Sequence, residues 1–327
     1  MEAGQRRPGR SSMKHIFVIA GITGVLSCSL QAAETLPSFK VQKVNLSTAD
    51  ARQTSLVDVD AHQQCLRIAN KLGSVRTSDC KSPYDFVTEG LSVRKLPIIV
   101  REYPPLKKLP RGRILMLGGI HGDEYSSVSI MFHWMRTLNE HHSGLFHWKV
   151  IPLVNPDGLL RKKSQRMNEN GVDLNRNFPT PNWQAESREY WEKRTHKNPR
   201  RYPGPYPLSE PESQWLAKEI ERFAPDVIVA VHAPYGILDF DGPHNDAPKR
   251  LGHLHLNVLG TYPGSLGNFA GIQQSIPVVT IELPYAGIMP TQGQVATIWR
   301  DLVVWLKKST SENRRQALAA TQDADPS

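Results

Sequence analysis

Short apolar runs alternate with longer helix-like segments along most of this chain, from Pro97 onward. The short runs are rich in Val, Ile and Leu, which is typical of strands in a buried parallel sheet. The pattern predicts strands over residues 98–103, 113–117, 148–154, 227–231 and 278–283, and helices over residues 126–138, 210–223 and 292–308. This alternation favours an α/β fold, a three-layer sandwich with a mixed, largely parallel central sheet.

A separate apolar run lies near the N-terminus. Residues 16–26 follow Lys14 and precede small or polar residues up to Ala33. This order is typical of a secretory signal peptide, and the run is too short to span a membrane comfortably. We therefore expect a signal peptide over residues 1–33, with Met13 as the true start, and no transmembrane span in the mature chain.

The remaining length predicts one catalytic domain with appendages. A chain of 327 residues with 39% hydrophobic and 22% charged content has ample material for one core. We expect an N-terminal accessory segment over residues 34–92, which contains a candidate amphipathic helix at 61–72. The catalytic domain would cover residues 93–308, and the polar, Ala-rich residues 309–327 would form a disordered tail.

The net charge of +9 comes partly from basic residues near the N-terminus, and the remaining basic excess is spread along the chain. No Lys/Arg run is interleaved with aromatic residues, so the composition argues against nucleic-acid binding. A basic surface could attract anionic wall polymers, although an ordinary solvated basic protein has the same composition.

Cysteine usage is consistent with export. Cys28 would leave with the signal after cleavage near Ala33 or Ser29, or it would carry a lipid, since it lies in an imperfect lipobox. Cys65 and Cys80 then remain as an even pair. An oxidising compartment would bridge them and stabilise the fold by up to about 3 kcal/mol, whereas a reducing one would leave two free thiols. We expect a periplasmic or secreted protein, with lipid anchoring as the alternative.

Polar side chains follow or interrupt the predicted strands. His121 and Glu124 come directly after an apolar run and could form half of a zinc site, although many loops carry such a pair in solvent. His232 ends another strand, as ligands in open α/β sheets commonly do. Glu282 interrupts an apolar strand, and because buried unpaired carboxylates are costly, a place beside a metal-bound water is favoured over a core salt bridge.

The order of five motifs resembles that of a known family. The chain carries His-x-x-Glu after a strand, Asn-Pro-Asp-Gly from residue 155, and Val-Asp-Leu-Asn-Arg-Asn-Phe-Pro from residue 172, then a strand-terminal His and a strand-borne Glu. Over roughly residues 85–308 it is similar to the zinc carboxypeptidases. Within that family the sequences of these motifs resemble those of the bacterial murein peptide amidases, which cut the bond between γ-D-glutamate and diaminopimelate in cell-wall peptides.

The resemblance implies a metal site and a general base. His121, Glu124 and His232 would hold one zinc ion per chain, because two imidazoles and one carboxylate suit zinc and leave a fourth position for water. Glu282 would take the proton from that water and pass it to the leaving amine.

The resemblance also implies residues that hold the substrate. Arg166 matches the arginine that stabilises the oxyanion, with an ordinary solvated arginine as the alternative. Asn175 and Arg176 match the pair that binds the free carboxylate of the substrate. Asp173 matches the carboxylate that orients a zinc-bound His.

The resemblance does not identify two further features of the family, the mobile tyrosine and the chemistry of the side-chain pocket. Many members carry a mobile tyrosine before the catalytic Glu, but Tyr262 lies in a loop of different length and precedes a proline, so we leave it out of the catalytic set. Residues 233–236 and 264–271 would shape the side-chain pocket. They predict neither an acidic floor for a basic residue nor an apolar floor for an aromatic one.

These inferences predict an exported zinc metallocarboxypeptidase or murein peptide amidase, whose partner is a cell-wall peptide with a free carboxylate. One alternative is an aspartoacylase-like zinc deacylase of N-acyl amino acids, which shares two motifs but acts inside the cell, so the signal peptide argues against it. Another alternative is a protein that binds wall peptides without cleaving them. The presence of every polar group expected for catalysis argues against it. The sequence does not predict the oligomeric state.

Overall fold

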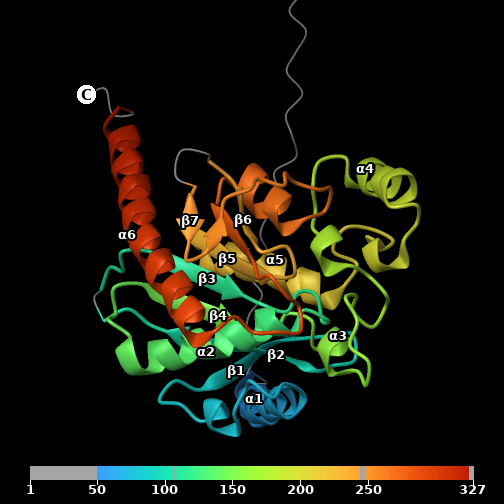
Figure 1. Cartoon of the computed structure of the whole chain (residues 1–327), viewed down its shortest axis with the longest axis horizontal. Helices are drawn as coiled ribbons and strands as arrows, with labels where there is room; N and C mark the ends of the chain where they lie inside the picture. The colour runs from blue at the N-terminus through green and yellow to red at the C-terminus, as the bar shows by residue number, and fades with distance from the viewer. Residues whose placement is uncertain (1–49, 107, 244–246, 324–327) are drawn as a thin grey trace, which may run out of the picture. The chain divides into compact units, whose positions relative to one another are not determined.

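A seven-stranded sheet organises the fold (Figure 1). The computed structural model describes residues 50–106, 108–243 and 247–323, and the side chains of those between 61 and 310. The strands stand in the order β1-β2-β4-β3-β5-β9-β6. Their bounds are β1 Phe86–Leu91, β2 Pro97–Tyr103, β3 Arg113–Leu117, β4 His147–Ile151, β5 Val227–His232, β6 Ile237–Asp241 and β9 Val278–Glu282.

The centre of the sheet is parallel and its edges are antiparallel. Strands β4, β3, β5 and β9 pair in parallel. Strands β1 and β2 continue the sheet beyond β4 in antiparallel pairings, and β6 pairs antiparallel with β9 at the other edge. A two-stranded ribbon, β7 (Arg250–Leu251) and β8 (Leu254–His255), forms a second small sheet beside β6, to which Leu256 makes an isolated bridge. The predicted mixed sheet with a largely parallel centre is confirmed.

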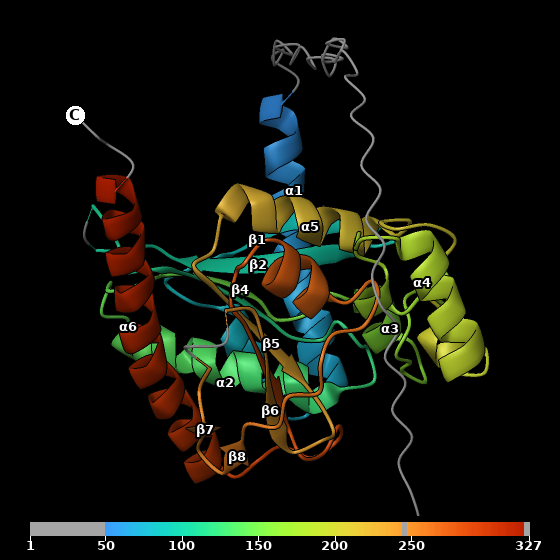
Figure 2. The same cartoon turned by 90° about the horizontal axis from the view of Figure 1, so that it is seen from above.

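Helices cover both faces of the sheet. Helices α1, α2 and α6 share one hydrophobic core with one face, and α5 packs in a second core on the opposite face (Figure 2). The helices are α1 Asp50–Lys71, α2 Tyr125–His141, α3 Pro156–Leu160, α4 Trp183–Glu189, α5 Pro211–Phe223 and α6 Gln292–Asp323. Short 3₁₀ or π turns are η1 Thr77–Cys80, η2 Leu174–Arg176, η3 Tyr190–Arg194, η4 Pro199–Arg201 and η6 Gly267–Gln273.

Strand β3 shows why most positions of the central strands are apolar. Its side chains point alternately to the two faces of the sheet. Ile114 and Met116 enter the core beneath α2, whereas Leu115 and Leu117 enter the core beneath α5. Because helices cover both faces, both sets of side chains in β3 are apolar, and the predicted three-layer sandwich follows.

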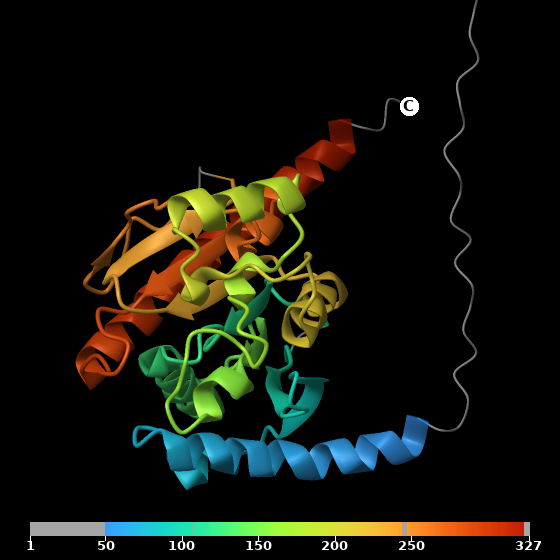
Figure 3. The same ribbon diagram turned by 90° about the vertical axis from the view of Figure 1, so that its right-hand side faces the viewer.

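Helix α1 and strand β1 belong to this same fold. Side chains of α1 pack in the core shared with α2, and Cys65 of α1 is joined to Cys80 by a disulfide with Cα atoms 5.6 Å apart. In Figure 3, α1 runs in blue beside β1, which pairs with β2. The domain boundary that we predicted at residue 93 falls between these paired strands, and an edge strand bonded to its neighbour is part of the sheet, so residues 61–92 are not a separate segment.

Other predicted boundaries either differ from those of the structure or fall outside the described residues. The last helix, predicted to end at residue 308, continues to Asp323, well into the residues predicted as a disordered tail. The predicted signal peptide, with Met13 and Cys28, and residues 34–49 of the predicted accessory segment lie outside the described residues. Among the helices that the structure describes, none combines the length and the apolar composition needed to cross a membrane.

Candidate active site

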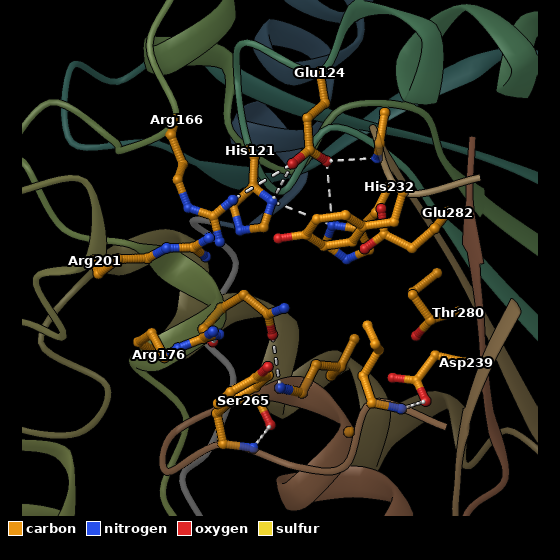
Figure 4. Close-up of a pocket in the computed structure, with 18 of the residues that line it drawn as sticks. His121, Glu124, Arg166, Arg176, Arg201, His232, Asp239, Ser265, Thr280 and Glu282 are labelled. Carbon is orange, nitrogen blue, oxygen red and sulfur yellow. Dashed lines mark hydrogen bonds and ion pairs between the residues drawn. The ribbon is translucent and has the colours of Figure 1, made fainter. Parts of the chain in front are cut away.

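Three potential metal ligands meet where β3 and β5 end, at one edge of the parallel centre (Figure 4). His121 lies in the loop that follows β3, Glu124 precedes the first turn of α2, and His232 is the last residue of β5. The loop turns sharply at Gly119, whose φ of +58° is a conformation that only glycine adopts without strain. Parallel neighbours β3 and β5 place their carboxyl ends side by side, which brings the ligands together.

The donor atoms of these residues converge. The Nδ1 atom of His121 lies 2.8 Å from Oε1 of Glu124 and 3.2 Å from Nδ1 of His232, which is 3.2 Å from Oε2 of Glu124. All three side chains are buried. A tetrahedral zinc ion with bonds of about 2.0–2.1 Å needs donor atoms about 3.3 Å apart. Both the spacing and the set of two imidazoles and one carboxylate therefore fit zinc.

Asp173 orients one of these ligands. Its Oδ1 lies 3.1 Å from Nε2 of His121, the ring nitrogen that faces away from the cluster. The same oxygen accepts the backbone N–H of Asn175 at the start of η2. Burial alone would raise the pKa of Asp173, but Arg166 and His121 hold that pKa well below its usual range. The carboxylate is therefore ionised and fixes the ring so that Nδ1 points inward.

Arg166 lies between the metal cluster and Asp173. Its Nε donates to Oδ2 of Asp173 at 2.9 Å, and its Nη1 lies 3.5 Å from Oε1 of Glu124. The side chain is only 7% exposed, so the alternative of a solvated arginine does not describe this residue. It lines the cavity beside the metal ligands and supplies a fixed positive charge there.

The loop that carries Arg166 is anchored by buried polar groups. Two residues further on, Nδ2 of Asn168 donates to Glu210 at 2.7 Å and to Glu212 at 3.1 Å. Burial raises the pKa of Glu212 to about 7, since no cation pairs with it in the described structure. Nδ2 of Asn155 also donates to the carbonyl of Arg166 at 3.1 Å. These bonds hold the backbone of Arg166 in place.

Glu282 faces the cluster from the neighbouring strand. It is the last residue of β9 and stands opposite His232 in the parallel pairing of β5 with β9. The side chain is 7% exposed, and its Oε2 has no hydrogen-bond partner among the described residues. Burial raises the pKa of Glu282, which makes the carboxylate a better proton acceptor.

Arg176 is a buried cation. It is 6% exposed and forms no ion pair with any residue that the structure describes, and its Nε is buried without a partner. Burial lowers the pKa of Arg176. Neighbouring Asn175 also lines the cavity, with Oδ1 accepting the N–H of Leu266 at 2.8 Å. The ring of Tyr262, which we left out of the catalytic set, lies 4.4 Å from the Arg176 guanidinium carbon and lines the same cavity.

The metal cluster borders one cavity of about 320 Å³, which is also lined by Arg166, Asn175, Arg176, Tyr262 and Glu282. Asp173 is fully buried and does not line it. The cavity also contains residues that the sequence did not indicate, among them Arg200 and Arg201 of η4 and the two acids of β6, Asp239 and Asp241. The acids were missed because β6 has only three apolar residues, too few for the apolar run that identified the central strands. The arginines lie in a loop whose position no local pattern predicts.

The sequence is similar to a known family of zinc enzymes and to several of its members. Residues 80–238 match the family described as zinc carboxypeptidase. Murein peptide amidase A of Escherichia coli K12 is 34% identical over 202 residues, which cover 60% of this chain and 79% of that protein. The same-named protein of Vibrio campbellii is 33% identical over 202 residues, covering 60% of this chain and 77% of that one.

Solved structures share the fold. A murein-tripeptide amidase from Escherichia coli O157 superposes with a TM-score of 0.51 at 26% identity, covering 71% of this chain and 95% of that chain. Carboxypeptidase A from Helicoverpa armigera has a TM-score of 0.58 at 18% identity and covers 80% of this chain and 81% of its own. The sheet, the ordered motifs and these likenesses agree that this chain is a hydrolytic enzyme and belongs to the zinc carboxypeptidase family.

Proposed function

We propose that this protein is an exported zinc-dependent peptidase that hydrolyses an amide bond next to a free carboxylate in murein peptides. Buried Arg176 forms no ion pair with a described residue and borders the same cavity as the metal cluster, and this observation carries the proposal. A planar guanidinium binds a planar carboxylate through two parallel hydrogen bonds. The likeness to proteins named murein peptide amidases supports the choice of a cell-wall peptide.

Each group of residues in the cavity has a separate role in the proposed reaction. A zinc ion held by His121, Glu124 and His232 would supply Lewis acidity and lower the pKa of water to about 7. Glu282 accepts the proton of the attacking water through its unpartnered oxygen and delivers it to the leaving nitrogen. Arg166, held by Asp173, offers positive charge to the carbonyl oxygen as it becomes an oxyanion.

Substrate orientation comes from the far side of the cavity. Arg176 and the Asn175 amide would hold the free carboxylate of the residue that leaves. This contact fixes which bond lies against Glu282 and the metal ligands, so that binding energy is converted into orientation. It also selects chain ends over internal peptide bonds.

Export is part of the proposal. The N-terminal apolar run is typical of a signal peptide, and the disulfide between Cys65 and Cys80 is of a kind that persists in oxidising compartments. We place the mature protein in the periplasm or outside the cell, where murein peptides are accessible.

Digestion of the tripeptide L-Ala-γ-D-Glu-diaminopimelate by the mature, zinc-loaded protein tests the proposed function. We expect release of free diaminopimelate, identified by mass, and no hydrolysis of N-acetylaspartate under the same conditions. The reverse result, with N-acetylaspartate hydrolysed and the tripeptide intact, would assign the protein to the deacylase alternative.

A further inference from the structure

A second cavity lies outside the candidate active site. It has a volume of about 800 Å³ and is formed by α4, η3 and the segment that follows η4. Helix α4 stands at the outer edge of the molecule in Figures 1 and 2. Of the described residues that line this cavity, none also lines the active-site cavity. The proposed reaction therefore gives it no role.

The walls of this cavity, which we call the aromatic groove, are rich in rings. Trp183, Trp191 and Tyr202 line it, together with Pro203 and Pro205. The rings of Trp191 and Tyr202 have centroids 5.1 Å apart and are inclined by 60°, so they form two adjoining walls. Small-molecule sites are typically lined by aromatic side chains with a few polar groups that fix the orientation of the ligand.

The indole N–H groups of the groove are already satisfied within the protein. Nε1 of Trp191 donates to the carbonyl of Asn198 at 2.8 Å, and Nε1 of Trp183 donates to the carbonyl of Arg176 at 3.0 Å. Both rings therefore offer apolar surface to a ligand. Hydrogen bonds to that ligand have to come from other side chains.

Helix α4 supplies these polar groups. Gln184 and Arg188 line the groove and lie four residues apart, so they are neighbours on one face of the helix. The amide of Gln184 forms no hydrogen bond with any described residue, whereas Nε of Arg188 lies 3.3 Å from Oε1 of Glu192. Ser187 follows Gln184 by three residues, and its Oγ is buried without a partner among the described residues. The groove thus combines apolar rings with unused polar groups.

The aromatic groove adjoins the active-site cavity. Tyr190 lines the active-site cavity and Trp191 lines the groove, and the same holds for Arg201 and Tyr202. Consecutive Cα atoms are only 3.8 Å apart, so the two spaces share a thin wall. The carbonyl of Tyr202 also accepts the backbone N–H of Asp173 at 2.8 Å. A substrate that extends beyond the active-site cavity at this wall reaches the groove.

A sugar ring matches both kinds of group in the groove. Its C–H faces are apolar and pack against aromatic rings, whereas its hydroxyl and acetamido groups need hydrogen-bond partners. A proline-rich peptide is another ligand of aromatic grooves. The polar groups of α4 and the adjoining active-site cavity favour the sugar, because murein peptides are joined at their N-terminal end to a chain of N-acetylated sugars.

We propose that the aromatic groove binds an N-acetylated sugar ring of the murein glycan strand. This inference rests on the proposed function and extends it from free murein peptides to peptides that are still attached to the glycan. The sugar takes no part in bond cleavage, so its contact adds binding energy without changing the chemical step. Its effect should therefore lie in KM and not in kcat.

Two substrates that differ only in the sugar test this inference in the mature, zinc-loaded protein. One is L-Ala-γ-D-Glu-diaminopimelate, and the other is the same tripeptide linked through its N-terminus to the disaccharide of N-acetylglucosamine and N-acetylmuramic acid. We expect kcat/KM to be about tenfold higher for the disaccharide-linked substrate, the size of effect that one aromatic contact gives. The gain should come from a lower KM.

Trp191→Ala should bring this preference close to one and leave kcat/KM for the free tripeptide unchanged. Gln184→Ala, at an exposed helical position where alanine is favourable, should lower the preference by a smaller factor. Tyr206→Ala is the matched control, because Tyr206 is an exposed ring of the same segment that does not line the groove. Equal kcat/KM for the two substrates, or a preference that survives in Trp191→Ala, would overturn the inference.

Titration with the disaccharide alone keeps this result separate from the proposed function. Tryptophan fluorescence of the unmutated protein should change and saturate, because Trp183 and Trp191 line the groove. Saturation without cleavage of either tripeptide would uphold the groove and refute the peptidase. Cleavage of both tripeptides at equal rates, without a fluorescence change, would uphold the peptidase and overturn the groove. Saturation by decaproline but not by the disaccharide would also overturn it.

Discussion

Replacing Glu282 with Gln is expected to lower kcat by roughly a hundredfold to ten-thousandfold, the range that general base catalysis contributes. Gln has nearly the same shape but cannot take a proton from water. The metal content should not change, because the metal cluster consists of His121, Glu124 and His232 and does not include Glu282. Steady-state kinetics on the tripeptide, with zinc measured in the same samples, checks both parts.

Glu124→Gln is the matched control for this variant. The chemical change is the same, but it removes a charged ligand, so zinc content and activity should fall together. An exposed glutamate such as Glu186 can be changed to Gln as a second control, and this variant should behave as the unmutated protein does. Activity in Glu282→Gln above about a tenth of normal would rule out its role as the general base.

Replacing Arg176 with Ala is expected to reduce kcat/KM for the tripeptide by roughly 30-fold to several thousand-fold, the range for loss of one partner of a buried charge pair. The same variant should have little effect on a tripeptide whose terminal carboxylate is an amide. The ratio of kcat/KM for the acid to that for the amide is therefore the quantity to measure.

Arg176→Lys should restore only part of this ratio, because an ammonium group cannot form the two parallel bonds of a guanidinium. Arg300→Ala, at an exposed position on α6, is the control and should leave the ratio unchanged. A high ratio in Arg176→Ala would mean that another group binds the carboxylate.

The sheet and the metal cluster could be predicted because each depends on local sequence. Most strands of the parallel centre are apolar runs, since both faces are covered, and such runs are visible without any knowledge of the tertiary structure. Strand β4 is the exception, because it contains Lys149, which is buried and paired with three glutamates. His121 and His232 each follow or end one of these strands. Parallel strands place their carboxyl ends at the same edge, so two local observations predicted that the residues would meet.

The place of Asp239 in the cavity depends on long-range pairing. Asp239 and Thr280 are brought opposite each other by the antiparallel register of β6 with β9, which no short segment encodes. Strand β6 has only five residues, two of them acidic, and lacks the apolar run that identified the central strands. Likewise β1 alternates weakly and is recognised as part of the sheet only through its pairing with β2.

Hydrolysis should depend on one ion held by His121, Glu124 and His232. Zinc should be titrated into chelator-treated protein, with bound zinc and release of diaminopimelate from the tripeptide measured in the same samples. Release should rise in proportion to bound zinc and stop rising at one ion per chain, and His232→Ala should neither bind zinc tightly nor release product. Full release by metal-free protein, or by His232→Ala, would contradict it.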